Sequence, residues 1–193
     1  MHEAVRIIED EHRSIAAVLH GLIHLTRRVR DHGEKPDFAV LHAMLDYIVS
    51  FPEKLHHPKE DRYLFAAVRT RNPQAAALLD SLEAEHAFGG TLIRRLMESL
   101  VAYETFGKFD EFARAVESYA DFHWAHMQRE EEEVLPLAKK TLTESDWESM
   151  AKAFKENDDP LFGIKPKQEF EQLFRRVVQL APAPIGIGPS SVA

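Results

Sequence analysis

Apolar residues recur at helical spacing along four long stretches of this chain, and very little of it alternates as a β-strand would. The four stretches span residues 2–31, 37–71, 74–103 and 109–140. Gly33 favours a helix C-terminus after the first stretch, and Pro52, inside the second, should remove one backbone hydrogen bond and bend that helix. Because short loops join long helices, consecutive helices should be antiparallel. The pattern predicts an all-α fold, an up-down-up-down four-helix bundle.

Two shorter helices are expected after the bundle. Thr143 and Asp146 resemble an N-terminal cap in front of a helix over residues 147–156. A last amphipathic helix should begin at Pro166 and cover either the bundle or a second subunit, which leaves a homodimer open. The expected organisation is a bundle in residues 1–142, a helical extension in 143–180 and, from its Pro, Gly and Ser content, a disordered tail in 181–193.

Composition excludes several classes of function. The chain has no cysteine, which removes disulfides, iron–sulfur ligation and thiol nucleophiles, so nitrogen and oxygen must hold any metal. A net charge of -8 with scattered basic residues argues against nucleic acid as a partner. No apolar run approaches the ~20 residues of a membrane span, and the acidic N-terminus lacks the layout of a secretory signal. We therefore expect a cytoplasmic protein with no membrane partner.

Histidine and glutamate recur at a spacing that suits a metal site. His56 and Glu60 stand four residues apart in the second stretch, and His126 and Glu130 do so in the fourth. This spacing puts both side chains of a pair on one face of a helix. The first and third stretches each carry a histidine within the apolar stripe, and these are His12 and His86.

The spacing also repeats between the two halves of the chain. His12 and His86 are 74 residues apart, while His56 and His126, like Glu60 and Glu130, are 70 apart. A doubled helical hairpin would bring two histidines and one glutamate from each half to a shared interior point, as in carboxylate-bridged di-metal sites of helix bundles. Imidazole and carboxylate ligands suit iron, manganese or zinc, and a pair of bridging carboxylates favours two iron ions.

Taken singly, each motif has a plainer interpretation. A histidine on an apolar stripe is usually a hydrogen-bonded core residue, and a His–Glu pair on a helix is often a surface contact. Burying four imidazoles and two carboxylates without a metal, however, would leave several polar groups unpaired at ~1–3 kcal/mol each. The coincidence in both halves favours the metal site.

The six residues resemble, in their order along four helices, the hemerythrin-like proteins with the HHE cation-binding domain, over roughly residues 5 to 140. The resemblance implies that Glu60 and Glu130 bridge two irons and that the four histidines are terminal ligands. Oxygen-carrying hemerythrins add a histidine one turn after the third-helix histidine, where this chain has Gly90. The pattern is therefore closer to four-His, two-Glu members, among them iron-centre repair proteins and iron-sensing domains, although the cysteine segment of many repair proteins is absent.

Several neighbouring residues leave alternatives open. His57 is a weaker candidate ligand that would pair with Asp61, either beside the site or at the surface. Three interpretations of His123 stay open, namely an extra ligand, a proton donor to bound oxygen or a core histidine. Gly89 and Gly90 indicate either room for a small ligand or a close helix contact. The remaining candidates are interpreted as a solvated face (Glu131, Glu132), hydrogen-bond partners or packing residues (Tyr63, Tyr119) and surface residues (His20, His24).

Two functions from different classes share this set of ligands. The first is a binding module in which the di-iron centre binds or senses a small ligand such as oxygen or nitric oxide, or responds to iron itself. The second is an oxidoreductase that reduces peroxide or oxygen, with His123 or a tyrosine delivering protons. Iron-centre repair and iron storage are further alternatives that the resemblance implies. A third interpretation keeps the bundle with zinc or no metal and uses the C-terminal helices as an interaction surface.

Overall fold

The computed structural model describes residues 2–157, 159 and 175, and all its regular elements are helical. The predicted all-α class is confirmed. The elements are α1 (Glu3–His32), α2 (Phe38–Ser50), η1 (Pro52–His56), α3 (His57–Lys59), η2 (Glu60–Phe65), α4 (Ala66–Arg71), η3 (Pro73–Ala75), α5 (Ala76–Phe106), α6 (Phe109–Arg129), η4 (Glu130–Val134), α7 (Leu135–Thr141) and α8 (Glu144–Lys155). None of the helices in this part of the chain is both long and apolar enough to cross a membrane.

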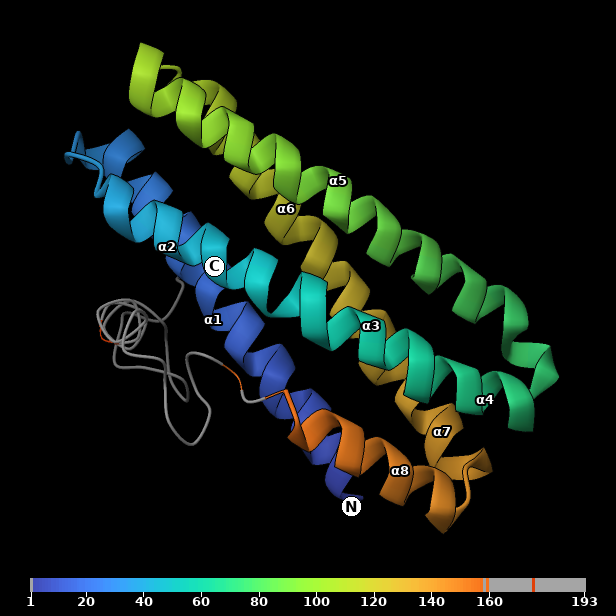
Figure 1. Ribbon diagram of the computed structural model, residues 1–193. Coiled ribbons are helices and arrows are strands. Elements are labelled where there is room, and N and C mark those ends of the chain that lie inside the picture. Colours follow the sequence, from blue (N-terminus) through green and yellow to red (C-terminus); the bar gives the residue numbers. More distant parts are fainter. Residues whose placement is uncertain (1, 158, 160–174, 176–193) are drawn as a thin grey trace.

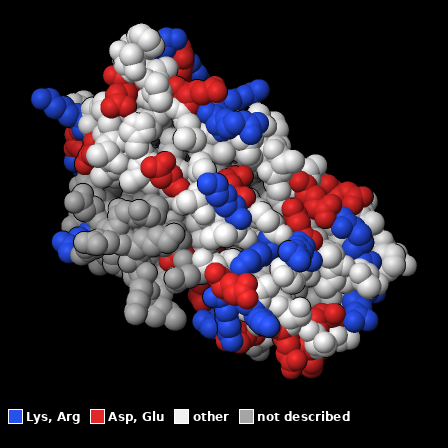
Figure 2. Space-filling view, in the orientation of Figure 1, with Lys and Arg blue, Asp and Glu red and all other residues white. Residues whose placement is uncertain are grey.

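Four rods lie side by side in the bundle (Figure 1). One rod is α1, and another is the run of successive helical segments from α2 to α4. The remaining two are α5 and the run from α6 to α7, and α5 packs along α6. The visible face carries acidic and basic side chains interspersed with uncharged ones (Figure 2).

Glycines end two of the rods. Gly33 follows α1 at φ 63° and Gly107 follows α5 at φ 69°, both in the left-handed region that a residue without a Cβ adopts at no steric cost. The predicted C-terminus of the first helix at Gly33 is confirmed. After the first of these turns, the Asp37 side chain accepts a hydrogen bond from the Val40 N–H and caps α2.

Three π-helical segments interrupt the rods beside the predicted ligands. η1 ends at His56, η2 begins at Glu60 and η4 begins at Glu130. In η1 the His56 N–H donates to the Phe51 carbonyl five residues earlier, at 3.2 Å. The sequence predicted that Pro52 removes one backbone hydrogen bond and bends the helix. The structure places this residue first in the π-helical η1, and the bend itself stays a prediction. Single π turns of this kind are frequent at functional sites.

The bundle contains two apolar cores with a polar layer between them. The first core holds Ile15 of α1, and the second core holds Ile8 of the same helix. His12 lies between them in sequence and is only 3% exposed. The other rods also pass from one core to the other. Their residues in the polar layer are His56 with Glu60, His86, and His126 with Glu130.

Helix α8 follows the bundle and packs on α1 and the second core through Trp147, Met150 and Phe154. The predicted cap is present, since the Thr143 hydroxyl accepts from the Asp146 N–H and the Asp146 side chain accepts from the Thr143 N–H. Apart from Arg175, the expected helix from Pro166 lies outside the described residues, as does the tail over 181–193, so a homodimer through this region stays a prediction.

Candidate metal centre

The structure brings the six predicted residues together in the polar layer. Their relative exposures are Glu60 0%, Glu130 0%, His56 1%, His126 2%, His12 3% and His86 8%. Ionisable side chains are almost never buried to this degree without compensating partners.

Glu60 joins residues from three rods. Its Oε1 lies 3.4 Å from His12 Nε2 and 3.3 Å from His56 Nε2, whereas its Oε2 lies 3.6 Å from His86 Nε2. One carboxylate therefore presents a different oxygen to each of two histidine groups.

Glu130 mirrors this arrangement. Its Oε2 lies 3.4 Å from His12 Nε2, and its Oε1 lies 3.6 Å from His86 Nε2 and 3.3 Å from His126 Nε2. Two half-sites result, each with one oxygen from each glutamate. The first half-site contains His12 and His56, and the second contains His86 and His126.

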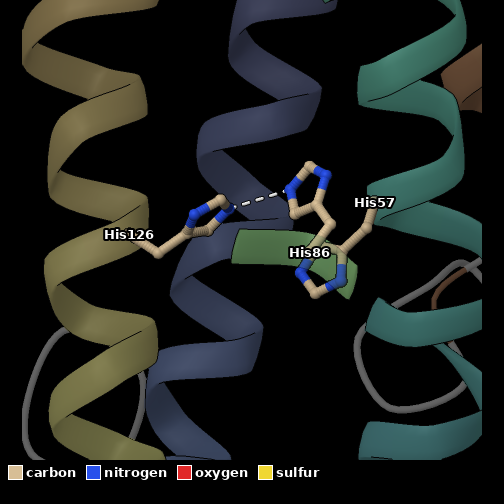
Figure 3. A group of neighbouring side chains, drawn as sticks. All are labelled: His57, His86 and His126. Carbon is tan, nitrogen blue, oxygen red and sulfur yellow. Dashed lines mark hydrogen bonds between the residues drawn. The ribbon is translucent and has the colours of Figure 1, made fainter. Parts of the chain in front are cut away.

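Several polar atoms of the half-sites have no hydrogen-bond partner within the described part of the chain, as expected where a cation binds. Both carboxylate oxygens of Glu60, both of Glu130, and His12 Nε2 are buried without a hydrogen-bond partner among the described residues. In the second half-site, His86 Nε2 and His126 Nε2 are 2.8 Å apart (Figure 3). Nitrogen ligands bind an ion at ~2.0–2.1 Å, so two adjacent ones lie about 3 Å apart. The buried donor set fits a pair of cations and leaves polar atoms orphaned without one.

The opposite nitrogen of each of the four histidines contacts a carboxylate. The Nδ1 contacts are His12 with Glu131 at 2.9 Å, His56 with Glu11 at 2.7 Å, His86 with Asp61 at 2.7 Å and His126 with Glu85 at 2.9 Å. When Nδ1–H donates to a carboxylate, the imidazole presents its Nε2 lone pair to the centre. Each ring is thus oriented for ligation by an acidic residue from another rod.

Sequence reasoning missed these four carboxylates, although a signal for them existed. Glu11 and Glu85 directly precede the predicted histidines and repeat at 74 residues, while Asp61 and Glu131 directly follow the predicted glutamates and repeat at 70. Two interpretations are corrected. Asp61 contacts His86 rather than His57, and Glu131 contacts His12 rather than belonging only to a solvated face.

His57 is buried at 4% exposure, so its interpretation as a surface residue is wrong. Its ligand nitrogens lie close to those of His86 and His126, and Figure 3 shows the three rings converging from three helical segments. The ring, however, stacks on His86 with centroids 4.4 Å apart and an interplanar angle of 16°. Because an imidazole lone pair lies in the ring plane, two stacked rings cannot both aim at one ion. In this conformation His57 covers His86.

A second polar group flanks the second half-site. The Tyr119 hydroxyl donates to Glu53 Oε1 at 3.3 Å and its ring lies 4.3 Å from that of His123. A Cβ on Gly89 would meet His123 Nε2 at 3.3 Å, which supports the close-contact interpretation of that glycine. Tyr63 packs at the edge of the second core.

The other histidine pair on α1 is partly buried rather than fully at the surface. The ring of His20 lies 5.0 Å from that of Trp124, and His24 is also half-buried.

Burial and charge shift the pKa values of the layer in opposite directions. Burial lowers the pKa of His56 to about 4 and that of His123 to about 3. For His86, burial works in the same direction, but the hydrogen bond with Asp61 and the nearby carboxylates of Glu130 and Glu60 outweigh it and raise the pKa to about 10. Burial likewise opposes the shift at Glu130, whose pKa is held well below its usual value by His126 and the other imidazoles. Without metal, protonated imidazoles supply the positive charge that a cation would bring.

Comparison with known families agrees with this geometry. A family model described as the Hemerythrin HHE cation binding domain matches residues 3–138. No curated protein and no solved structure matched the chain in the corresponding searches.

Proposed function

We propose that this chain, which belongs to the hemerythrin HHE cation-binding domain family, holds two metal ions, iron by preference, and binds or senses a small ligand such as oxygen or nitric oxide at them. His12 and His56 would hold one ion, and His86 and His126 the other. Glu60 and Glu130 would bridge the pair within an up-down-up-down bundle.

One observation carries the proposal. The two fully buried carboxylates each direct one oxygen toward each histidine pair, and none of the four oxygens has a hydrogen-bond partner among the described residues. An isolated buried carboxylate is costly, and a bridging position between two cations compensates both of its oxygens.

The donor chemistry favours iron. The set holds nitrogen and oxygen only, which suits iron, manganese or zinc, and two bridging carboxylates favour a redox-active pair. When bound, such a pair supplies redox chemistry and open coordination positions for a diatomic ligand or peroxide.

The protein contributes orientation and the exclusion of water. The four Nδ1 carboxylates fix the rings, while Phe65 stacks on His86 at 5.6 Å and Phe154 lies edge-on to His56 at 6.2 Å. Aromatic rings on both half-sites keep solvent from the ligand nitrogens.

A second candidate function is an oxidoreductase that reduces peroxide or oxygen, with His123 or Tyr119 as proton donor. The pKa of His123, lowered to about 3 by burial, keeps this imidazole neutral at physiological pH and so argues against it as a general acid. Tyr119, whose hydroxyl donates to Glu53, is then the proton donor of this candidate function. Iron storage and iron-centre repair use the same ligand set and remain alternatives.

Ligand titration of the iron-loaded chain separates the two functions. The binding function predicts a stable optical change that saturates at one oxygen or nitric oxide per di-iron centre, with little steady-state consumption of peroxide. Sustained peroxide turnover with an added reductant would refute the binding function and support the oxidoreductase. Preferential loading with zinc, and no optical response to either gas, would remove both.

A further inference from the structure

Helix α8 contacts the polar layer, although it lies beyond residue 138, where the family match ends. The Lys59 ammonium donates to the Ala153 carbonyl at 2.6 Å, and this carbonyl in the last turn of α8 also accepts from the Glu156 N–H at 3.3 Å. Phe154 is 1% exposed and lies against His56. The C-terminal end of α8 is therefore fixed beside the first half-site.

Asn157, just after α8, is linked through Glu11 to the candidate ligand His56. Its Nδ2 donates to Glu11 Oε1 at 2.9 Å and to Oε2 at 3.1 Å, and Glu11 Oε2 is hydrogen-bonded to His56 Nδ1 at 2.7 Å. Asn157 is 3% exposed and Glu11 is 5% exposed, so little solvent competes for these hydrogen bonds. An unbroken chain of hydrogen bonds runs from the end of α8 to a predicted metal ligand.

The carboxylates of the second half-site are held differently. Asp61 contacts His86 and lies in the same rod as Glu60. Glu85 contacts His126 and is also paired with Arg129 of α6. These supports come from the bundle itself. The two half-sites therefore differ in their dependence on α8.

We propose that Asn157 is a positioning residue for the first half-site: by fixing Glu11, which orients His56, it raises the affinity of that half-site for its metal ion. The inference rests on the proposed di-metal function. The backbone N–H of Asn157 donates to the Phe154 carbonyl at 3.0 Å and so closes the end of α8 without help from the side chain. The side-chain amide of Asn157 is therefore not required to end the helix.

Stepwise metal affinity of the full chain tests the inference. Asn157→Ala should weaken the binding of one of the two metal ions by up to ~10-fold, because losing a direct partner of a metal ligand costs ~10–100-fold and Asn157 acts one contact further out, through Glu11. Asp61→Asn, which removes the corresponding support of His86, should weaken the other ion. Zinc and anaerobic ferrous iron, each in competition with a chelator, are the probes.

A structural signal identifies the affected ligand. In the diamagnetic zinc-loaded protein, the imidazole nitrogen chemical shifts of His56 should change in Asn157→Ala, while those of His86 stay within error. Ala151→Gly is the matched control, since it lowers the helix propensity of α8 without altering the Asn157–Glu11 contact. If general loosening of α8 were the cause, Ala151→Gly would reproduce the metal loss and overturn the inference.

A double-mutant cycle tests whether Asn157 acts through Glu11. In the Glu11→Ala background, where Asn157 has no carboxylate to fix, adding Asn157→Ala should change metal affinity by less than twofold. Additive effects, equal weakening of both ions, or unchanged affinities in Asn157→Ala would each refute the positioning role. A parent chain that binds no metal would instead refute the proposed function, which keeps the two failures distinct.

Discussion

Replacing Glu60 with glutamine separates a metal-bridging role from a structural one. The side chain is fully buried, and its two oxygens lie 3.3–3.6 Å from the Nε2 atoms of three histidines. Glutamine keeps the shape and one oxygen but removes the negative charge. Both ions would then lose an anionic bridging ligand at once.

The expected magnitude follows from the layer. Outer partners of metal ligands alone are worth ~10–100-fold in affinity, so loss of a bridging ligand should cost at least about 100-fold, or about 2.8 kcal/mol. The metal-free fold should change little. Glu130 remains to pair with the protonated imidazoles, and His12 can release its proton, so no buried charge is left alone. We expect the free energy of unfolding to stay within about 1 kcal/mol, or about 2–4 °C in Tm.

Paired measurements decide the outcome. Chelator competition gives the metal affinity, and thermal unfolding of the metal-free protein gives its stability. Glu132→Gln, the same chemical change on an exposed side chain, is the matched control and should alter neither. Two ions bound as tightly as in the parent, or a large fall in the Tm of the metal-free protein, would refute the bridging argument.

Three further outcomes follow. Gly90→Ala should stabilise the protein by about 0.5–1 kcal/mol, because the added Cβ meets only an ordinary contact at 3.6 Å. Gly89→Ala should stabilise it less, because the added Cβ would lie 3.2 Å from the His123 ring. Equal free energies of unfolding in urea for the two variants would contradict this. The pKa of Asp146 is lowered to about 2, chiefly by Arg71, so its charge stabilises the fold above its unfolded pKa near 4 and this effect is lost as pH falls toward 2. Asp146→Asn should therefore cost about 0.5–1 kcal/mol in urea unfolding at pH 6, a figure reduced for solvent screening, and almost nothing near pH 2; a constant difference would refute the assignment. Removing metal with a chelator should lower the Tm, because an ion held at 100 times its Kd stabilises the folded state by about 2.7 kcal/mol; an unchanged Tm would argue against binding to the folded chain.

The sequence predicted the helices well because their signals are local. Apolar spacing defined the rods, and Gly33 and the Thr143 cap marked boundaries that the structure reproduces. The π turns were not predicted. A proline such as Pro52 signals a missing backbone N–H donor, but whether a π-helical turn forms there depends on packing across the bundle.

The sequence predicted that the six candidate ligands converge, which the structure shows, but it did not predict which carboxylates contact them. His–Glu pairs at helical spacing can be read from one helix, and their repetition indicated convergence. The pairing of Glu11 with His56 joins different rods, so it depends on how the rods are packed. Asn157 gave no local signal at all, since it reaches Glu11 only once α8 is seated.

Iron content with Mössbauer spectroscopy tests the central claim most directly. The full chain would be loaded anaerobically with isotopically enriched ferrous iron, desalted and measured before and after oxidation. We expect two irons per chain that become a magnetically coupled pair. Fewer than two irons, or two that remain magnetically independent, would contradict a centre bridged by Glu60 and Glu130.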